Sequence, residues 1–205
     1  MTENGTDKKR KIVSEEQTAG LKRHREELRR IVTESLQEAL LALMEKQCYD
    51  AITITALCKK AGVSRMAFYG NYATKDDILK SVITDLQKEL VRRIGSPFRK
   101  PVTEQWYVGL FRLVKEKSNV LKLIFGAGFQ VKYLELVNGI LQRHKNMATE
   151  EIYLRLFWCG GIVNAVIYWL AHGLKETPEE MAAICNKYLF SYNESTCVKG
   201  AAFRG

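Results

Sequence analysis

Apolar residues recur along the first half of the chain at intervals of three and four positions, which places them on one face of a helix. The first such stripe predicts a long helix with a buried face, and its members are Leu28, Ile31, Val32, Leu36, Ala39, Leu40 and Leu43. Later stripes predict helices at about residues 53–61, 65–72 and 74–94. Thr53 and Ser64 have hydroxyl groups that can cap helix N-termini, and Gly62 suits a left-handed turn between the two short helices.

The second half of the chain continues the helical pattern. Its apolar spacing predicts helices at about residues 103–117, 119–126, 129–146, 150–173 and 178–191. The last of these has a well-marked start, because Thr177 can cap it, Pro178 suits the first helical position and Glu180 can complete a capping box. The sequence lacks the alternation that is typical of strands, so we expect an all-α fold.

Charge and cysteine content narrow the class of partner and the compartment. The formal net charge of +9 favours a polyanionic partner, either nucleic acid or an anionic membrane surface, and both halves of the chain share the excess. The five cysteines form no close pair and no metal-type spacing, so we expect reduced thiols, with a redox-sensing cysteine as the alternative. The polar N-terminus does not resemble a secretory signal. We therefore expect a cytoplasmic protein.

Two short helices joined by a glycine turn, with longer helices on both sides, are typical of a helix-turn-helix that enters a major groove of DNA. On the second short helix, Phe68 and Tyr72 can face the core, while Arg65, Met66 and Tyr69 turn outwards. An outward arginine can bind guanine or phosphate, and an outward methionine can touch a thymine methyl group. Phosphate contacts that set the register can come from Tyr69, Thr55 and Lys75.

The segment TITALCKKAGVSRMAFYGNYATKDDIL, residues 53–79, resembles the DNA-binding domain of the TetR family of bacterial transcriptional regulators. The family pattern is roughly T-x-x-x-I-A-x-x-A-G-V-S-x-x-x-x-Y-x-x-F-x-x-K-x-x-L. The residues that match it as they stand are Thr53, Ala61, Gly62, Val63, Ser64, Tyr69, Lys75 and Leu79. This sequence departs from the pattern at Ala56, where an acidic capping partner is usual, and at Gly70, where a larger side chain is common. A C-terminal stretch, LFWCGGIVNAVIYWLAHGLKETPEEMAAI, is similar to the pattern of one TetR subgroup.

The resemblance implies a homodimeric repressor that binds a near-palindromic operator in double-stranded DNA and answers to a small apolar or amphipathic effector. The DNA-binding residues that we expect are Thr53, Thr55, Ser64, Arg65, Met66, Tyr69, Asn71 and Lys75. The glycine and proline of the segment GSPFRKP favour a domain boundary there. The expected parts are a polar tail (1–22), a three-helix DNA-binding domain with a connecting helix (23–95), a helical regulatory and dimerisation domain (96–192) and a C-terminal tail (193–205).

The second half contains candidate residues for a ligand pocket and a dimer interface. Aromatic residues that either line an effector pocket or simply form core are Trp106, Phe111, Phe125, Phe129 and Trp158. Candidates for the dimer interface are Trp158, Ile162, Val166, Trp169, Met181 and Ile184.

Three other classes of function compete with a DNA-binding regulator. The run Leu156–Ala171 has no charged residue, but its 16 residues and the central Asn164 fall short of the roughly 20 apolar residues of a spanning helix. We expect no membrane span. The histidines His24, His144 and His172 are isolated from any metal or triad spacing, so we expect no cofactor, no metal and no catalysis. An adaptor that resembles a regulator but acts through protein contacts without an operator stays open.

Overall fold

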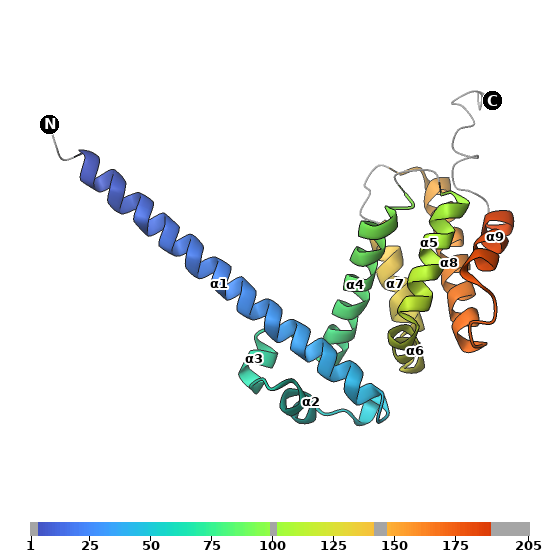
Figure 1. Cartoon of the computed structure of the whole chain (residues 1–205), viewed down its shortest axis with the longest axis horizontal. Coiled ribbons are helices and arrows are strands. Elements are labelled where there is room, and N and C mark those ends of the chain that lie inside the picture. The colour runs from blue at the N-terminus through green and yellow to red at the C-terminus, as the bar shows by residue number, and fades with distance from the viewer. Residues whose placement is uncertain (1–3, 99–101, 142–146, 190–205) are drawn as a thin grey trace. The chain divides into compact units, whose positions relative to one another are not determined.

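The structure is a computed structural model that describes residues 4–98, 102–141 and 147–189. Within these residues it contains helices and no strand, so the expected all-α fold is confirmed (Figure 1). The N-terminal elements are α1 (Asn4–Met44), a short 3-10 helix η1 (Tyr49–Ala51), α2 (Ile54–Ala61), α3 (Arg65–Tyr69) and α4 (Lys75–Ile94). The C-terminal elements are α5 (Glu104–Glu116), α6 (Ser118–Gly126), α7 (Gln130–Leu141), α8 (Thr149–Ala171) and α9 (Pro178–Tyr188).

The chain divides into two compact units, Met1–Ile78 and Leu79–Gly205. The division therefore falls inside α4, whereas the sequence placed a boundary at the glycine and proline residues of 95–101. The reason is that α4 continues past Ile78 and its later side chains, among them Gln87 and Leu90, line a cavity of the C-terminal unit. The limits of the two domains as functional parts stay a prediction.

Helix α1 begins at Asn4, far ahead of the apolar stripe that predicted it. The residues expected to form a tail over 1–22 therefore belong largely to this helix. Lysine, arginine, glutamate and glutamine have good helix propensities, so they can prolong a helix beyond its apolar stripe. Leu28 and Ile31 are about half exposed, and complete burial starts only at Leu36. The buried members of the stripe are thus Leu36, Ala39 and Leu40, and Leu43 is half-buried.

The C-terminal unit has an aromatic and aliphatic core. Helix α5 packs along α9, and α8 packs against α6 and α7. Phe111 of α5 and Trp169 of α8 meet edge to face, with ring centroids 5.5 Å apart. At the start of α9, Thr177 accepts a hydrogen bond from the Glu180 backbone N–H at 3.1 Å, and Glu180 accepts one from the Thr177 backbone N–H. The predicted capping box is confirmed.

Helix α8 is long and apolar enough, by length and composition, to cross a bilayer. Its described side chains argue instead for packing inside a protein, because many of them are buried by the C-terminal unit itself. Arg155 is among them, at 6 % exposure. Its guanidinium donates a hydrogen bond to Glu151 at 2.5 Å and lies 4.9 Å from the centre of the Phe98 ring. A paired, buried arginine is expensive in lipid and suits a protein core better.

Candidate nucleic-acid interface

Helices α2 and α3 are short, and local hydrogen bonds define where each begins. The Thr53 hydroxyl accepts a hydrogen bond from the Ala56 backbone N–H at 3.1 Å, and the Ser64 hydroxyl accepts one from the Ala67 N–H at 3.0 Å. Each cap satisfies one of the backbone donors that a helix N-terminus leaves without an intrahelical partner. Both caps agree with the sequence. Both hydroxyl oxygens therefore already accept a hydrogen bond from the protein backbone.

The turn between α2 and α3 is built on Gly62. Its φ of +68° lies in the left-handed region, which a residue with a Cβ adopts only at a cost. The next residue, Val63, donates its backbone N–H to the Cys58 carbonyl at 3.1 Å, which closes the end of α2. The glycine therefore allows α3 to begin shortly after the turn.

The inner face of α3 packs into the N-terminal unit as the sequence predicted. Phe68 is completely buried and Tyr72, just beyond the helix, is 8 % exposed. The two rings lie 6.5 Å apart. Helix α3 ends at Tyr69, earlier than expected, because Gly70 and Asn71 turn the chain. These inner contacts hold the short helix in place and fix which of its side chains point to solvent.

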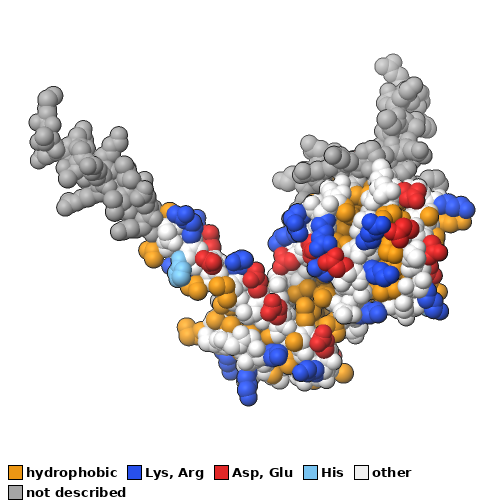
Figure 2. All heavy atoms as spheres, in the orientation of Figure 1, with side chains coloured by type: hydrophobic (Ala, Val, Ile, Leu, Met, Phe, Trp, Pro, Cys, Tyr) orange, Lys and Arg blue, Asp and Glu red, His pale blue; other side chains and the backbone are white. Residues whose placement is uncertain are grey.

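The outer face of α3 is free in the structure. Met66 is 87 % exposed and Tyr69 is 53 % exposed, and Arg65 is exposed beside them. Thr55 of α2 is also exposed. Figure 2 shows Lys and Arg side chains gathered over the part of the N-terminal unit that α2 and α3 form. A positively charged face with a protruding helix is the arrangement that a DNA-binding protein presents to phosphate and to base edges.

Asn71 has a structural role that the sequence did not reveal. Its side-chain amide donates a hydrogen bond to the Ala67 carbonyl at 2.7 Å, and its oxygen accepts a longer one from Arg29 at 3.5 Å. The side chain therefore caps the C-terminal end of α3 and is only partly exposed. The amide of Asn71 is thus used to end the helix in the structure, and its predicted contact with DNA stays a prediction.

Lys75, also predicted to contact phosphate, is used inside the protein. Its ammonium donates hydrogen bonds to the backbone carbonyls of Tyr49 at 2.7 Å, Asp50 at 3.1 Å and Ile52 at 3.1 Å. An ammonium has three N–H donors, so these carbonyls take all of them. The charge also lies 4.4 Å from the centre of the Tyr49 ring. Lys75 thus joins the first turn of α4 to the segment before α2. Its contact with phosphate stays a prediction, and that contact would require the ammonium to release these carbonyls.

Tyr49 and Asp76 complete this junction, and the sequence did not single them out. The Tyr49 hydroxyl donates a hydrogen bond to the Asp76 carboxylate at 2.6 Å. Burial, followed by this carboxylate, raises the pKa of Tyr49 well above its usual range. The hydroxyl therefore keeps its proton at any physiological pH. The available signal was local, since Tyr49 lies in the KQCYD segment where the first apolar stripe ends.

The described residues contain no cluster of three or more His, Cys, Asp or Glu side chains that could hold a metal ion. They do line a partly open cavity of about 150 Å³ in the C-terminal unit. Of the five aromatics proposed as pocket lining, Trp106, Phe125 and Trp158 line it. Phe111 and Phe129 are buried in the core and do not line this cavity, and the effector pocket itself stays a prediction.

Most of the candidate dimer residues are buried within their own unit, and the dimer interface itself stays a prediction. Buried within their own unit, at 8 % exposure or less, are Trp158, Ile162, Val166, Trp169 and Met181. Of the six, only Ile184 is exposed, at 47 %. Because α8 is apolar on all sides, its sequence does not show which face meets the core. The exposed apolar face of α8 consists of Tyr153, Phe157 and Tyr168, with Asn164 between them.

An N-terminal helix-turn-helix with an exposed second helix, followed by a helical unit, defines a class of all-α DNA-binding regulators. Comparison with known families agrees with this class. The pattern of "Bacterial regulatory proteins, tetR family" matches residues 36–82, and that of "Transcriptional regulator C-terminal region" matches residues 103–191. The chain belongs to the TetR family of transcriptional regulators. Members of this family are in general not enzymes.

One curated relative and two solved structures add to the comparison. The "Uncharacterized HTH-type transcriptional regulator YxbF" of Bacillus subtilis (strain 168) is 39 % identical over 66 residues, which is 31 % of this chain and 17 % of that protein. A TetR transcriptional regulator from Streptococcus agalactiae 2603V aligns with a TM-score of 0.56 at 18 % identity, covering 78 % of this chain and 94 % of that one. The dihydroxyacetone kinase operon activator DhaS aligns with a TM-score of 0.51 at 15 % identity, covering 77 % and 93 %. Both structures support the fold.

Proposed function

We propose that this protein is a cytoplasmic, sequence-specific repressor that binds operator DNA as a homodimer and is released by a small-molecule effector. The observation that carries the proposal is the exposed outer face of α3. The Ser64 cap holds the start of this helix, Phe68 anchors its inner face, and Arg65, Met66 and Tyr69 are exposed. A rigid helix with free outer side chains can place them against base edges in a major groove.

Within this proposal the outer side chains have different tasks. Arg65 can hold guanine or phosphate with its guanidinium, and Met66 can contact a thymine methyl group. Tyr69 and Thr55 offer hydroxyl groups to phosphate oxygens, which set the position of the helix along the duplex. Thr53 and Ser64 cap their helices, and their backbone positions at the helix N-termini can still approach phosphate.

Capture of genomic DNA fragments by the purified protein tests the DNA-binding role. A sequence-specific protein retains a few fragments when salt is raised, because non-specific binding to phosphate falls steeply with salt. If Arg65 reads guanine, Arg65→Ala should weaken binding to those fragments by about 1–3 kcal/mol. Arg92→Ala, which removes an exposed arginine from α4, is the matched control and should bind normally. Retention of the same fragments by Arg65→Ala at full affinity would contradict the assignment.

The proposed dimer uses the exposed apolar face of α8, with Phe157 at 73 % exposure and Tyr168 at 64 %. Exposed aromatics at this spacing on one helix favour a protein contact, since single domains rarely leave such a face in water. The α3 helices of the two protomers then need a separation of about 34 to 36 Å to enter successive major grooves. Because the dimer has two-fold symmetry, the operator should be near-palindromic. Phe157→Glu should produce monomers in light scattering. Val131→Glu on α7, at 67 % exposure, is the control that should leave the oligomeric state unchanged.

An adaptor or activator that works through protein contacts is the second candidate. The observation behind it is the fold likeness to DhaS, which is an operon activator. The Arg65→Ala variant separates the two roles. A repressor loses operator retention and repression together, whereas an adaptor keeps its protein partner and its effect on transcription.

A further inference from the structure

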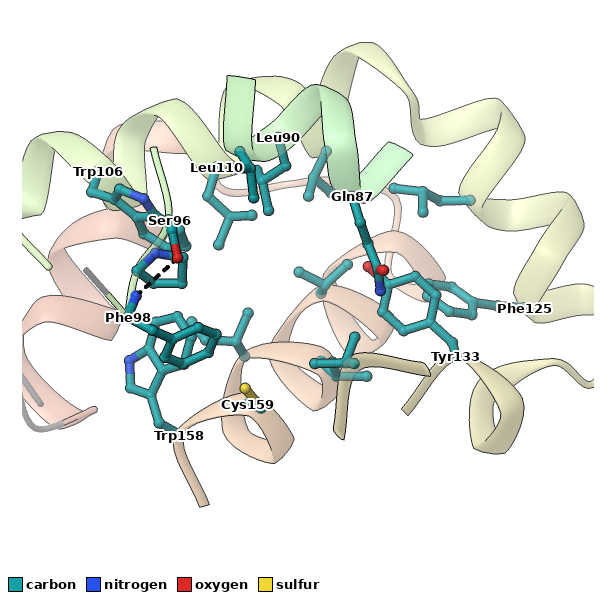
Figure 3. Close-up of a pocket in the computed structure, with 18 residues that line it drawn as sticks. Gln87, Leu90, Ser96, Phe98, Trp106, Leu110, Phe125, Tyr133, Trp158 and Cys159 are labelled. Atoms are coloured by element: carbon teal, nitrogen blue, oxygen red, sulfur yellow. Dashed lines mark hydrogen bonds between the residues drawn. The ribbon is translucent and has the colours of Figure 1, made fainter. Parts of the chain in front are cut away.

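The cavity of the C-terminal unit is apolar almost throughout. Its lining comes from α4, the segment after α4, and helices α5 to α8, and every lining residue lies in the described part of the chain. Figure 3 shows Phe98, Trp106 and Trp158 grouped at one side of the cavity and Phe125 with Tyr133 at the other. No Asp, Glu, Lys, Arg or His side chain is among the lining residues. A ligand that enters the cavity would therefore leave water and contact mainly aromatic and aliphatic side chains.

The few polar groups on the lining are mostly satisfied. The Trp106 indole N–H donates to the Gly95 carbonyl at 3.1 Å, and the Trp158 indole N–H donates to the Tyr107 hydroxyl at 2.8 Å. The Ser96 hydroxyl accepts a hydrogen bond from the Phe98 backbone N–H at 3.3 Å. These bonds hold the aromatic end of the cavity in shape and leave its indoles no donor for a ligand.

Gln87 differs from these groups. Its side-chain nitrogen, Nε2, is buried and has no hydrogen-bond partner among the described residues. Figure 3 shows the side chain reaching from α4 towards the Tyr133 and Phe125 side of the cavity. A buried amide N–H₂ without an acceptor is unfavourable, and a ligand that supplies one removes that penalty.

Charge and size narrow the class of molecule that fits. Burial raises the pKa of Tyr133 and of Cys159 to about 12, so both lining side chains are neutral near pH 7. A charged ligand would lose its hydration without gaining a counter-charge. The volume of about 150 Å³ is close to that of an apolar protein cavity of about 150 Å³ that admits benzene.

We propose that this cavity binds a neutral molecule with a single ring and one hydrogen-bond acceptor, which takes the bond that Gln87 Nε2 donates. The proposal rests on the effector control proposed above and names its chemical class: small aromatic or alicyclic ketones, aldehydes and amides. Gln87 sets the selectivity for the acceptor, and the aromatic residues hold the ring. A ligand that binds Gln87 contacts α4 itself, and the first turn of the same helix contains Lys75.

Calorimetry on the full chain without DNA tests this pairing with three probes. Acetophenone has a ring and a carbonyl acceptor, α-methylstyrene has the same shape with a C=CH₂ group in place of C=O, and benzoate carries a charge. Acetophenone should bind about tenfold more tightly than α-methylstyrene, the effect of about one net hydrogen bond. Benzoate should not bind measurably.

Two glutamine variants assign that difference to Gln87. Gln87→Met keeps the length of the side chain and removes the donor, so the preference for acetophenone should be lost. α-Methylstyrene should then bind at least as tightly, because acetophenone would bury its carbonyl without a donor. Gln105→Met makes the same change at an exposed position of α5 and should keep the tenfold preference. If Gln87→Met does not fold, Gln87→Leu replaces it as the variant without a donor. The comparison of acetophenone with α-methylstyrene on the wild-type chain tests the proposal without any variant.

The outcomes that overturn the inference are distinct from failure of the proposed function. The inference is wrong if both probes bind the wild-type chain equally, or if the preference for acetophenone survives Gln87→Met. It is also wrong if benzoate binds more tightly than acetophenone, or if acetophenone does not bind up to its solubility. Genomic fragment retention is measured separately, without probes, on the same protein. A chain that binds acetophenone selectively but retains no fragment would refute DNA binding while this inference holds.

Discussion

Removal of the Lys75 ammonium should destabilise the N-terminal unit. In Lys75→Met the apolar stem remains and three backbone carbonyls, those of Tyr49, Asp50 and Ile52, lose their shared donor. Water can replace the ammonium at the exposed Asp50 carbonyl, so that bond contributes little. The two partly buried bonds come from a charged donor, for which about 1.5–3 kcal/mol each is typical, and because they share one ammonium their effects are less than additive.

We therefore expect Lys75→Met to lower the free energy of unfolding by about 2–4 kcal/mol. Urea unfolding followed by circular dichroism measures this change. Lys60→Met is the matched control, because Lys60 is an exposed lysine on α2, and such surface changes usually stay within about 0.5 kcal/mol. DNA affinity should fall only as far as the helix-turn-helix loses its shape.

The dependence of DNA affinity on salt separates positioning from direct contact. A lysine that neutralises a phosphate contributes about 0.9 to the slope of log affinity against log salt, and its removal reduces the slope by about that amount. Lys75→Met should leave the slope of the folded protein unchanged. A variant that keeps wild-type stability, binds DNA weakly and shows the reduced slope would refute the structural reasoning and restore Lys75 as a phosphate contact.

Three further predictions follow from local geometry. Ser64→Ala should lower the free energy of unfolding by about 1 kcal/mol through loss of the α3 cap, measured by urea unfolding. Gly62→Ala should lower it by about 1–2 kcal/mol, because a Cβ is strained at a φ of +68°, and equal stability in the same assay would be evidence against that turn. Because burial raises the pKa of Cys159 to about 12, its thiolate forms only near that pH. At pH 8, iodoacetamide should therefore modify the exposed Cys48 in the native chain long before Cys159, as mass spectrometry of the peptides will show.

The helix caps and the glycine turn could be predicted because each depends on neighbours in sequence. A hydroxyl at Ser64 or Thr53 reaches a backbone N–H three residues on, whatever the rest of the chain does. The left-handed turn at Gly62 is likewise a property of one residue and the end of one helix. Burial of Phe68 and exposure of Met66 also followed, since Phe68 and Tyr72 lie four residues apart and share one face of the helix, whereas Met66 lies on another.

The faces of α8 and the partners of Lys75 could not be predicted in this way. Helix α8 is apolar on every side, so periodicity does not distinguish the face of Trp158 and Trp169, which is buried, from the face of Phe157, which is exposed. The carbonyls that bind the Lys75 ammonium lie more than 20 residues earlier in the chain, and backbone carbonyls carry no sequence signal. Both facts depend on which segments the fold brings together.

The sequence alone thus determined the helical class, the helix-turn-helix and the family of this protein, because short-range spacing and backbone chemistry encode them. The tertiary structure alone decided that Lys75 joins α4 to the segment before α2 and that Asn71 ends α3. It also decided that the exposed face of α8 is Tyr153, Phe157 and Tyr168, and that Gln87 places its buried Nε2 atom at an apolar cavity. The physical reason is the same in each case. Burial and hydrogen-bond partners are properties of pairs of segments that are distant in the chain, and only packing brings them within reach of each other.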